Sequence, residues 1–189
     1  MKKPKVQLKK LQMFEGHDGY GFNADIWVNG VKCFHAHDDA WGGEYEYYDY
    51  KDHNNENNPN NAKIDANVQL LNDYIASLPE YPLEFNGNVA KNDDGSTKML
   101  KHDLDSFING LVIEELKAKE EKKLQKKMKT CILFGKKGDD HYAYLNFKKP
   151  LSSFPLGYLQ MQVDQIKKQH CTGDIEILNT NLGDLGVKL

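Results

Sequence analysis

The sequence predicts an α+β protein in which strands and helices are grouped along the chain. Between residues 5 and 50, apolar and polar residues alternate with a period of two, as in half-buried antiparallel strands. Between 65 and 116, apolar residues recur every three or four positions, as in helices that cover a core. The last 60 residues return to short strand patterns around one further helix.

The clearest local signal is the pair Asn29 and Gly30, which follows the alternating residues 22–28. Asn-Gly is favoured in the two-residue type I′ turn of a hairpin, because both positions need a positive φ. A regular register then gives the pairs Val28 with Val31, Ile26 with Cys33, Ala24 with His35, and Phe22 with His37. We therefore expect a hairpin with both histidines on the face of Phe22 and Ile26, followed by a strand over 44–50.

The middle of the chain predicts two helices separated by irregular segments. Residues 51–61 are rich in asparagine and of low complexity, so we expect a mobile loop. One helix is expected from about Asp65 to the residue before Pro79, and a second from near Ser96. Residues 117–129 keep strong helix formers but lose the apolar stripe, which is typical of a helix that connects two modules through solvent.

Residues 130–189 predict a ββαβ module. The strands are expected at 130–135, 141–147 and 174–178, and the helix at 155–169, with Gly173 in the position that often ends a helix. The predicted organisation is an N-terminal domain over 1–116, formed by an antiparallel β-meander with two helices. A lysine-rich connector helix over 117–129 and a C-terminal ββαβ module over 130–189 follow.

The basic residues exclude some functions, because all 25 of them are lysine. Arginine provides the forked contacts that read guanine and the fingers that assist phosphoryl transfer. We therefore expect no sequence-specific DNA reading of that kind and no arginine-finger chemistry. The net charge of -3 is too small to draw the whole chain onto nucleic acid or a membrane.

The cysteines indicate a reducing compartment. Cys33, Cys131 and Cys171 are odd in number, far apart and without a CxxC motif, so neither a disulfide framework nor a zinc ribbon is expected. No stretch approaches the roughly 20 apolar residues that span a bilayer. We expect a cytoplasmic protein without a membrane partner.

The segment from Glu15 to Tyr50 resembles the opening of uncharacterised accessory proteins of phages and mobile elements. The resemblance covers about a fifth of the chain. It depends on Gly21-Phe22 before the strand, Asn29-Gly30 at the turn, and Asp39, Trp41-Gly42-Gly43 and Tyr45 after it. These motifs are structural, so the resemblance implies no catalytic residues.

His35 and His37 form the candidate metal pair. Residues two apart on a strand project to one face about 7 Å apart, a spacing at which two imidazoles can share a metal. Further ligands could come from His17, Asp18, Asp38 and Asp39. Because no third ligand has a fixed spacing, the sequence favours two structural histidines at the edge of an apolar layer, and we expect no cofactor.

An aromatic and acidic segment is the candidate partner-binding surface. It comprises Trp41, Glu44, Tyr45, Glu46, Tyr47, Tyr48 and Tyr50. Alternation along a strand places Tyr45 and Tyr47 on one face of the sheet. The other face then carries Glu44, Glu46, Tyr48 and Tyr50. Exposed Trp and Tyr contribute much of the binding energy at protein interfaces, and the acids favour a basic protein surface as partner. Ordinary sheet packing is the alternative for either face.

The lysine-rich segment 117–129 is the candidate nucleic-acid contact. It holds seven lysines against two glutamates, a local charge of +5. Such a charge attracts a phosphate backbone without reading its sequence. The candidate contacts are Lys119, Lys122, Lys123, Lys126 and Lys127. The alternative is a solvated helix supported by Glu–Lys pairs.

Together these patterns predict a non-enzymatic interaction protein of a phage or mobile element. We expect it to bind and inhibit a host defence complex in the bacterial cytosol, such as an RNA-guided nuclease, in the manner of anti-CRISPR proteins. The acidic segment would meet host protein and the lysine helix would meet the RNA backbone of a ribonucleoprotein. Two alternatives stay open: a metal-dependent enzyme built on His35 and His37, with Asp38 or Asp39, and a general RNA-binding accessory protein.

Overall fold

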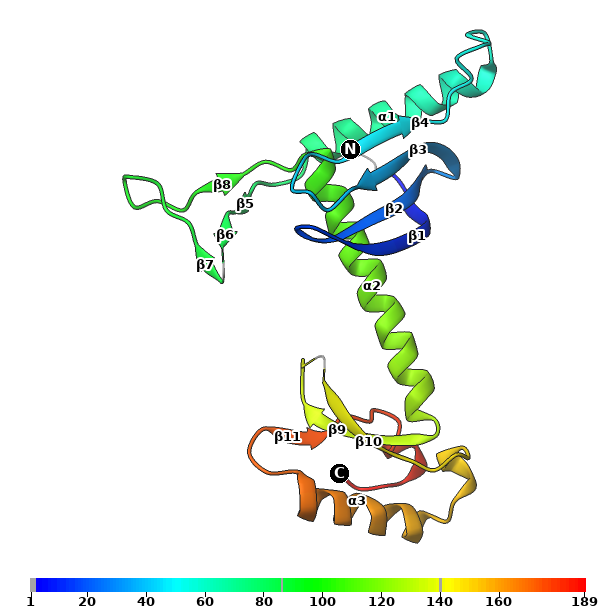
Figure 1. The fold of residues 1–189 in the computed structure, drawn as a ribbon, viewed down its shortest axis with the longest axis vertical. Helices are drawn as coiled ribbons and strands as arrows, with labels where there is room; N and C mark the ends of the chain where they lie inside the picture. Colours follow the sequence, from blue (N-terminus) through cyan, green and yellow to red (C-terminus); the bar gives the residue numbers. More distant parts are fainter. Residues whose placement is uncertain (1–2, 86, 140) are drawn as a thin grey trace. The chain divides into compact units, whose positions relative to one another are not determined.

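A computed structural model describes residues 3–85, 87–139 and 141–189, and it confirms the α+β class (Figure 1). The chain divides into two compact units, residues 1–116 and 117–189. Helix α2 (Leu104–Met128) contributes its N-terminal half to the first unit and its C-terminal half to the second. In the described part of the chain, no helix is long and apolar enough to cross a membrane.

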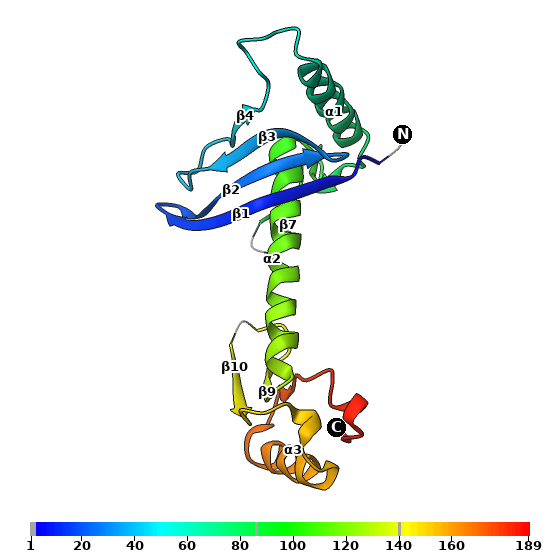
Figure 2. The ribbon, with the colours of Figure 1, turned by 90° about the vertical axis from the view of Figure 1, so that its right-hand side faces the viewer.

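The first unit is built on a four-stranded antiparallel meander in the order β1-β2-β3-β4. Its strands are β1 (Val6–Gly16), β2 (Gly19–Val28), β3 (Val31–Asp38) and β4 (Glu46–Asp49). Helix α1 (Pro59–Ala76) and the N-terminal half of α2 pack on one face of this sheet (Figures 1 and 2). The core between them includes Phe22, Ala24, Ile26, Phe34, Ala36, Ile64, Leu71, Ile75, Ile108 and Val112.

The Asn29-Gly30 turn is confirmed. Both residues have positive φ, 49° and 83°, and Val28 pairs with Val31 across the turn. The Asn29 side chain also accepts a hydrogen bond from the backbone nitrogen of Lys5 at 3.0 Å, which fixes the start of β1 against the turn. The asparagine therefore supplies both the left-handed backbone and a tertiary contact.

A β-bulge at Cys33 changes the register that follows the turn. Trp27 lies opposite Lys32, whereas Ile26 already lies opposite Phe34. Because a shift of one residue exchanges the two faces of a strand, His35 and His37 point away from the core. The predicted pairs of both histidines are therefore wrong. The observed pairs are Asp25 with His35, and Asn23 with His37.

Helix α1 begins at Pro59, before the expected start near Asp65. The Asn58 side chain caps the helix by accepting a hydrogen bond from Asn60 N at 3.0 Å, and proline suits the first helical position because its missing N–H is not needed there. Asn61 connects the helix to the preceding loop, since its side-chain oxygen accepts from Asp52 N at 2.9 Å. The asparagine-rich loop thus shortens to 51–58, and its mobility stays a prediction.

Helix α2 begins at Leu104, so the expected start near Ser96 is wrong. Asp103 and Ser106 cap it reciprocally: Ser106 N donates to Asp103 Oδ1 at 2.8 Å, and Asp103 N donates to Ser106 Oγ at 3.0 Å. The preceding residues form two short antiparallel pairs, β5 with β8 and β6 with β7. These strands are β5 (Tyr81–Pro82), β6 (Glu84–Phe85), β7 (Asn88–Val89) and β8 (Met99–Leu100).

The second unit is a three-stranded antiparallel sheet in the order β10-β9-β11, covered on one face by α3. Its elements are β9 (Cys131–Lys136), β10 (Tyr142–Asn146), η1 (Leu151–Ser153), α3 (Leu156–His170), β11 (Ile175–Ile177) and η2 (Gly183–Leu185). Leu124 and Met128 of α2 pack on Cys131 and Leu133. The predicted connector helix is therefore also a packing element of this unit.

Candidate functional site

The face of the N-terminal sheet opposite α1 and α2 is the candidate site, because no helix of the described chain covers it. We call it the open face. The side chains that alternate with the core residues project from it. They include Lys9 and Gln12 of β1, Asn23, Asp25 and Trp27 of β2, Lys32, His35 and His37 of β3, and Glu46 and Tyr48 of β4, with Tyr50 just beyond.

Asp25 is the centre of a polar network on this face, although it is only 4% exposed. Tyr50 donates its hydroxyl to Asp25 Oδ1 at 2.6 Å, and Lys32 Nζ lies 3.0 Å from Oδ2. His35 Nδ1 lies 3.2 Å from Oδ1, and Lys10 Nζ lies 3.6 Å from Oδ2. Burial alone would raise the pKa of Asp25, but the hydrogen bonds from Tyr50, Lys32 and His35 hold that pKa well below its usual range. Asp25 is therefore an ionised anchor for side chains from several strands.

Lysine side chains on the open face lie over aromatic rings. Lys9 Nζ is 3.5 Å from the centroid of the Trp27 ring, and Lys32 Nζ is 3.6 Å from that of Tyr50. The contact with Tyr50, together with Asp25, raises the pKa of Lys32. Asp25 compensates the charge of Lys32, whereas Lys9 keeps its positive charge over the neutral ring of Trp27.

His35 and His37 lie on one face, as the metal hypothesis requires, but both are already hydrogen-bonded. His35 Nε2 and His37 Nδ1 lie 3.3 Å and 2.8 Å from the same oxygen, Asn23 Oδ1, while His35 Nδ1 contacts Asp25. The two lysines on Asp25 would also repel a cation there. The pair therefore belongs to the polar network of the open face.

The further metal ligands that the sequence suggested have other partners. Asp38 accepts a hydrogen bond from the backbone nitrogen of Ala40, and Asp39 accepts one from that of Trp41, each at 2.9 Å. His17 Nδ1 contacts Asp18 Oδ1 at 3.0 Å. In the ranges that the structure describes, no three His, Cys, Asp or Glu side chains are placed to hold a metal ion.

The aromatic and acidic segment divides between the two faces of the sheet. Tyr45 and Tyr47 face the core, where their rings meet those of Phe22 and Phe34 edge-on. Asp105 of α2 accepts hydrogen bonds from Tyr47 OH at 2.6 Å and from Tyr45 N at 3.1 Å. Burial and, to a smaller extent, the hydrogen bond to Asp105 raise the pKa of Tyr47. This packing removes Tyr45 and Tyr47 from the predicted partner surface.

The other members of that segment are exposed. Glu46, Tyr48 and Tyr50 lie on the open face, and Tyr48 donates its hydroxyl to the Glu46 carboxylate, which raises the pKa of Tyr48. Trp41 and Glu44 lie in the exposed loop between β3 and β4. Five of the seven predicted residues therefore remain available to a partner.

Trp41 belongs to a cluster that the sequence analysis did not identify. The turn between β1 and β2 meets the β3–β4 loop, because Asp18 N donates to Ala40 O at 2.8 Å. His17 stacks on Trp41 with their ring centroids 5.0 Å apart, and Tyr20 follows the same turn. We call His17, Tyr20 and Trp41 the aromatic tip. Tyr20 and Trp41 are 72% and 67% exposed, and the separation of His17 from Trp41 in the sequence gave no sign of their contact.

The five predicted nucleic-acid contacts all lie on the C-terminal half of α2, in the second unit. Lys123, Lys126 and Lys127 line a groove of about 550 Å³ together with Lys129, Thr130 and Pro150. Lys122, which directly precedes Lys123, and Lys119, about one turn earlier, are exposed outside it. The structure thus brings three of the five into one groove.

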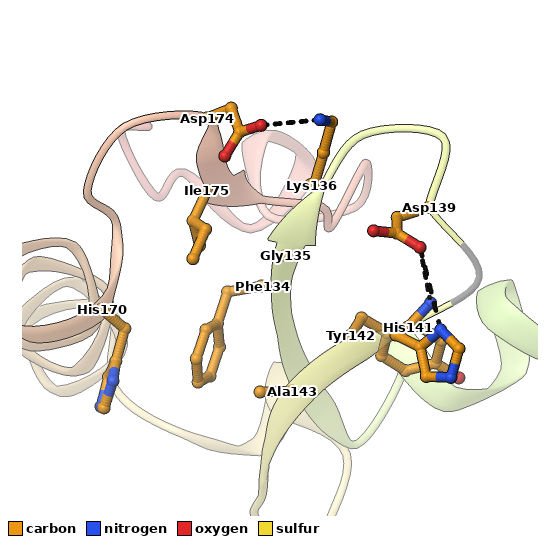
Figure 3. Close-up of a pocket in the computed structure, with 10 residues that line it drawn as sticks. All are labelled: Phe134, Gly135, Lys136, Asp139, His141, Tyr142, Ala143, His170, Asp174 and Ile175. Carbon is orange, nitrogen blue, oxygen red and sulfur yellow. Dashed lines mark hydrogen bonds and ion pairs between the residues drawn. The ribbon is translucent and has the colours of Figure 1, made fainter.

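A second hollow in this unit, of about 570 Å³, surrounds the end of β9 (Figure 3). His170 stacks on Phe134, Lys136 forms an ion pair with Asp174 at 2.9 Å, and His141 lies on the other side of the strand (Figure 3). The titratable groups do not converge on a common point. This hollow therefore offers no catalytic arrangement.

Comparisons with known proteins add no relative: no family model, no curated protein and no solved structure matches the chain.

Proposed function

We propose that this chain is a non-enzymatic interaction protein that binds a partner protein through the open face and the aromatic tip. One observation supports the proposal most directly. The open face presents exposed aromatic rings, and hydrogen bonds and ion pairs within the face hold its side chains in place. The network around Asp25 orders the face, and the exposed Trp41 lies in the loop between β3 and β4. Rigid, exposed Trp and Tyr side chains are typical of the residues that contribute most to protein–protein binding.

The charges of this surface favour a basic partner. Lys9 and Lys32 are covered by ring or carboxylate contacts. Glu44 and Glu46 are exposed; Glu44 shares a loop with Trp41, and Glu46 contacts the Tyr48 hydroxyl. The charged residues next to Trp41 and Tyr48 are therefore acidic, which suits a lysine- or arginine-rich protein surface.

In its specific form, the proposal is a phage or mobile-element protein that inhibits a defence complex, such as an RNA-guided nuclease, in the cytosol of a bacterial host. Two features support this form. Residues 15–50 resemble accessory proteins of such elements, and the lysine-rich half of α2 is a second surface of opposite charge, suited to the RNA of a ribonucleoprotein. The metal-dependent alternative has no support, since His35 contacts Asn23 and Asp25 and His37 contacts the same Asn23 oxygen.

The experiment is capture of the partner from a bacterial lysate, followed by affinity measurements with purified components over a range of salt concentrations. We expect the Trp41→Ala/Tyr48→Ala variant to bind at least about 30-fold more weakly at every salt concentration, because aromatic burial is not screened. The Glu44→Gln/Glu46→Gln variant should lose affinity mainly at low salt. Val89→Ala, an exposed apolar residue of the same unit outside this surface, is the matched control.

Two results would contradict the proposal. Equal affinity of the Trp41→Ala/Tyr48→Ala variant and the Val89→Ala control would exclude the open face and tip as the interface. If the captured partner belongs to no defence complex, and the protein leaves the activity of an RNA-guided nuclease unchanged, inhibition of a defence complex is excluded. The proposal that the open face binds a partner would not be affected by that result.

A further inference from the structure

Tertiary contacts concentrate positive charge in the second unit beyond what the lysine-rich segment carries. Thr130 O accepts a hydrogen bond from Phe147 N at 3.0 Å, and Lys129 O accepts one from Leu151 N at 2.7 Å. These bonds hold the loop after β10 against the end of α2, so Lys148 and Lys149 lie beside Lys129. Segments 117–130 and 141–155 together hold nine lysines and two glutamates, a net charge of +7 in a chain whose net charge is -3.

Aromatic rings are interleaved with these lysines. Lys127 Nζ lies 3.5 Å from the centroid of the Tyr144 ring and 4.7 Å from that of Tyr142. Tyr144 is 51% exposed, on the same face of the sheet as α2. Lysines interleaved with exposed aromatic rings are typical of proteins that bind single-stranded nucleic acid. The phosphates contact the lysines, and a base stacks on the aromatic ring.

The lysines of this surface lack anionic partners in the part of the chain that the structure describes. Among the described residues, no carboxylate forms an ion pair with Lys123, Lys126, Lys127, Lys129, Lys148 or Lys149. Gln125 donates to Glu121, which lines a different hollow with Glu120, Leu124 and Met128. Lys126 and Lys127 do interact favourably with the C-terminal end of the α2 dipole, but the other four lysines gain less from it.

We propose that this surface, formed by Lys123, Lys126, Lys127, Lys129, Lys148, Lys149, Tyr142 and Tyr144, binds single-stranded nucleic acid. The phosphate backbone lies along the groove at the end of α2, and one base stacks on the Tyr144 ring. A duplex fits poorly, because its base faces are hidden in the stack. Binding is independent of base sequence, since ammonium groups read no base edges. The proposal does not depend on the partner of the open face.

The test is fluorescence anisotropy of the full chain with labelled oligouridine, oligothymidine and a duplex, each about 12 nucleotides long. Neutralisation of about five phosphates gives a slope near -3.5 for log affinity against log salt on a single strand. Lys148→Gln/Lys149→Gln should reduce the magnitude of that slope by about 1.4. Tyr144→Ala should weaken binding about 5- to 160-fold at an unchanged slope, and Tyr144→Phe should restore it. Equal affinity for RNA and DNA is expected.

The matched control is Lys167→Gln/Lys168→Gln, another adjacent pair in the same unit but on α3. It should leave both affinity and slope unchanged. Circular dichroism melting curves separate any loss of folding from a loss of contact. Absence of binding at low salt, equal affinity for the duplex, preferential binding of polyglutamate, or an equal effect of the control pair would each overturn the proposal.

Discussion

The network around Asp25 provides the sharpest test of how the open face is held together, through the variant Asp25→Asn. Asparagine has nearly the same shape as aspartate, so core packing is preserved. Its amide oxygen can still accept from Tyr50, but its NH₂ group would face the ammonium of Lys32 or the ring of His35. The variant therefore places an amide in contact with the Lys32 ammonium, which can only donate, and removes the negative charge that Lys32 pairs with.

The expected loss follows from the individual contacts. Lys10 is 78% exposed at its side chain and regains water freely, so its contact with Asp25 contributes little. The contacts of Asp25 with Lys32 and His35 are largely shielded, and hydrogen bonds to charged groups contribute about 1.5–3 kcal/mol each. Because both partners are partly exposed and can be rehydrated, we expect Asp25→Asn to lower the free energy of unfolding by about 2–4 kcal/mol at pH 7.

The pH dependence has a definite sign. The folded pKa of Asp25 lies below the unfolded value, so the stabilisation is fully present above about pH 4 and is lost as the pH falls toward the folded pKa. On this basis the difference in unfolding free energy between wild type and Asp25→Asn should be nearly constant between pH 5 and 7. It should shrink below about pH 4.

Urea unfolding followed by tryptophan fluorescence measures this effect, because both tryptophans, Trp27 and Trp41, lie in the first unit. Asp93→Asn, at an exposed position of the same unit, is the matched control and should unfold like wild type at each pH. If Asp25→Asn is as stable as wild type at pH 7, or if their difference persists undiminished at pH 3, the described network does not hold the open face.

Two further predictions concern residues outside this network. Asn179 is buried and joins the chain end to β9, since its Oδ1 accepts from Leu133 N at 2.6 Å and its Nδ2 donates to Cys131 O at 2.9 Å. Asn179→Ala should lower the stability of the second unit by about 2–4 kcal/mol, seen as an earlier urea transition in circular dichroism; an unchanged transition would contradict these contacts. Cys33 and Cys131 are buried while Cys171 is half-buried, and burial raises the pKa of the Cys33 thiol. A disulfide reagent should therefore modify Cys171 first in the native protein, and a fast phase that survives Cys171→Ser would refute this order.

The sequence by itself determined the class of the fold and most elements of the second unit. Period-two alternation and the Asn-Gly pair identify the first hairpin because they act on the local backbone. The strands and helix of the second unit begin and end within two residues of their expected bounds for the same reason. The starts of α1 and α2 were also encoded locally, in Asn58-Pro59 and in Asp103 with Ser106, but apolar periodicity alone did not reveal these caps.

Only the tertiary structure decided which side chains share a surface. The bulge buries both Cys33 and Phe34 against the core, and this single extra residue moves His35 and His37 onto the open face with Asp25. Contacts between segments far apart in sequence likewise bring His17 to Trp41 and the loop of Lys148 to Lys129. Local propensities restrict φ and ψ of each residue. The strand register, the face on which a side chain lies and the clustering of charges depend instead on the free energy of packing distant segments together.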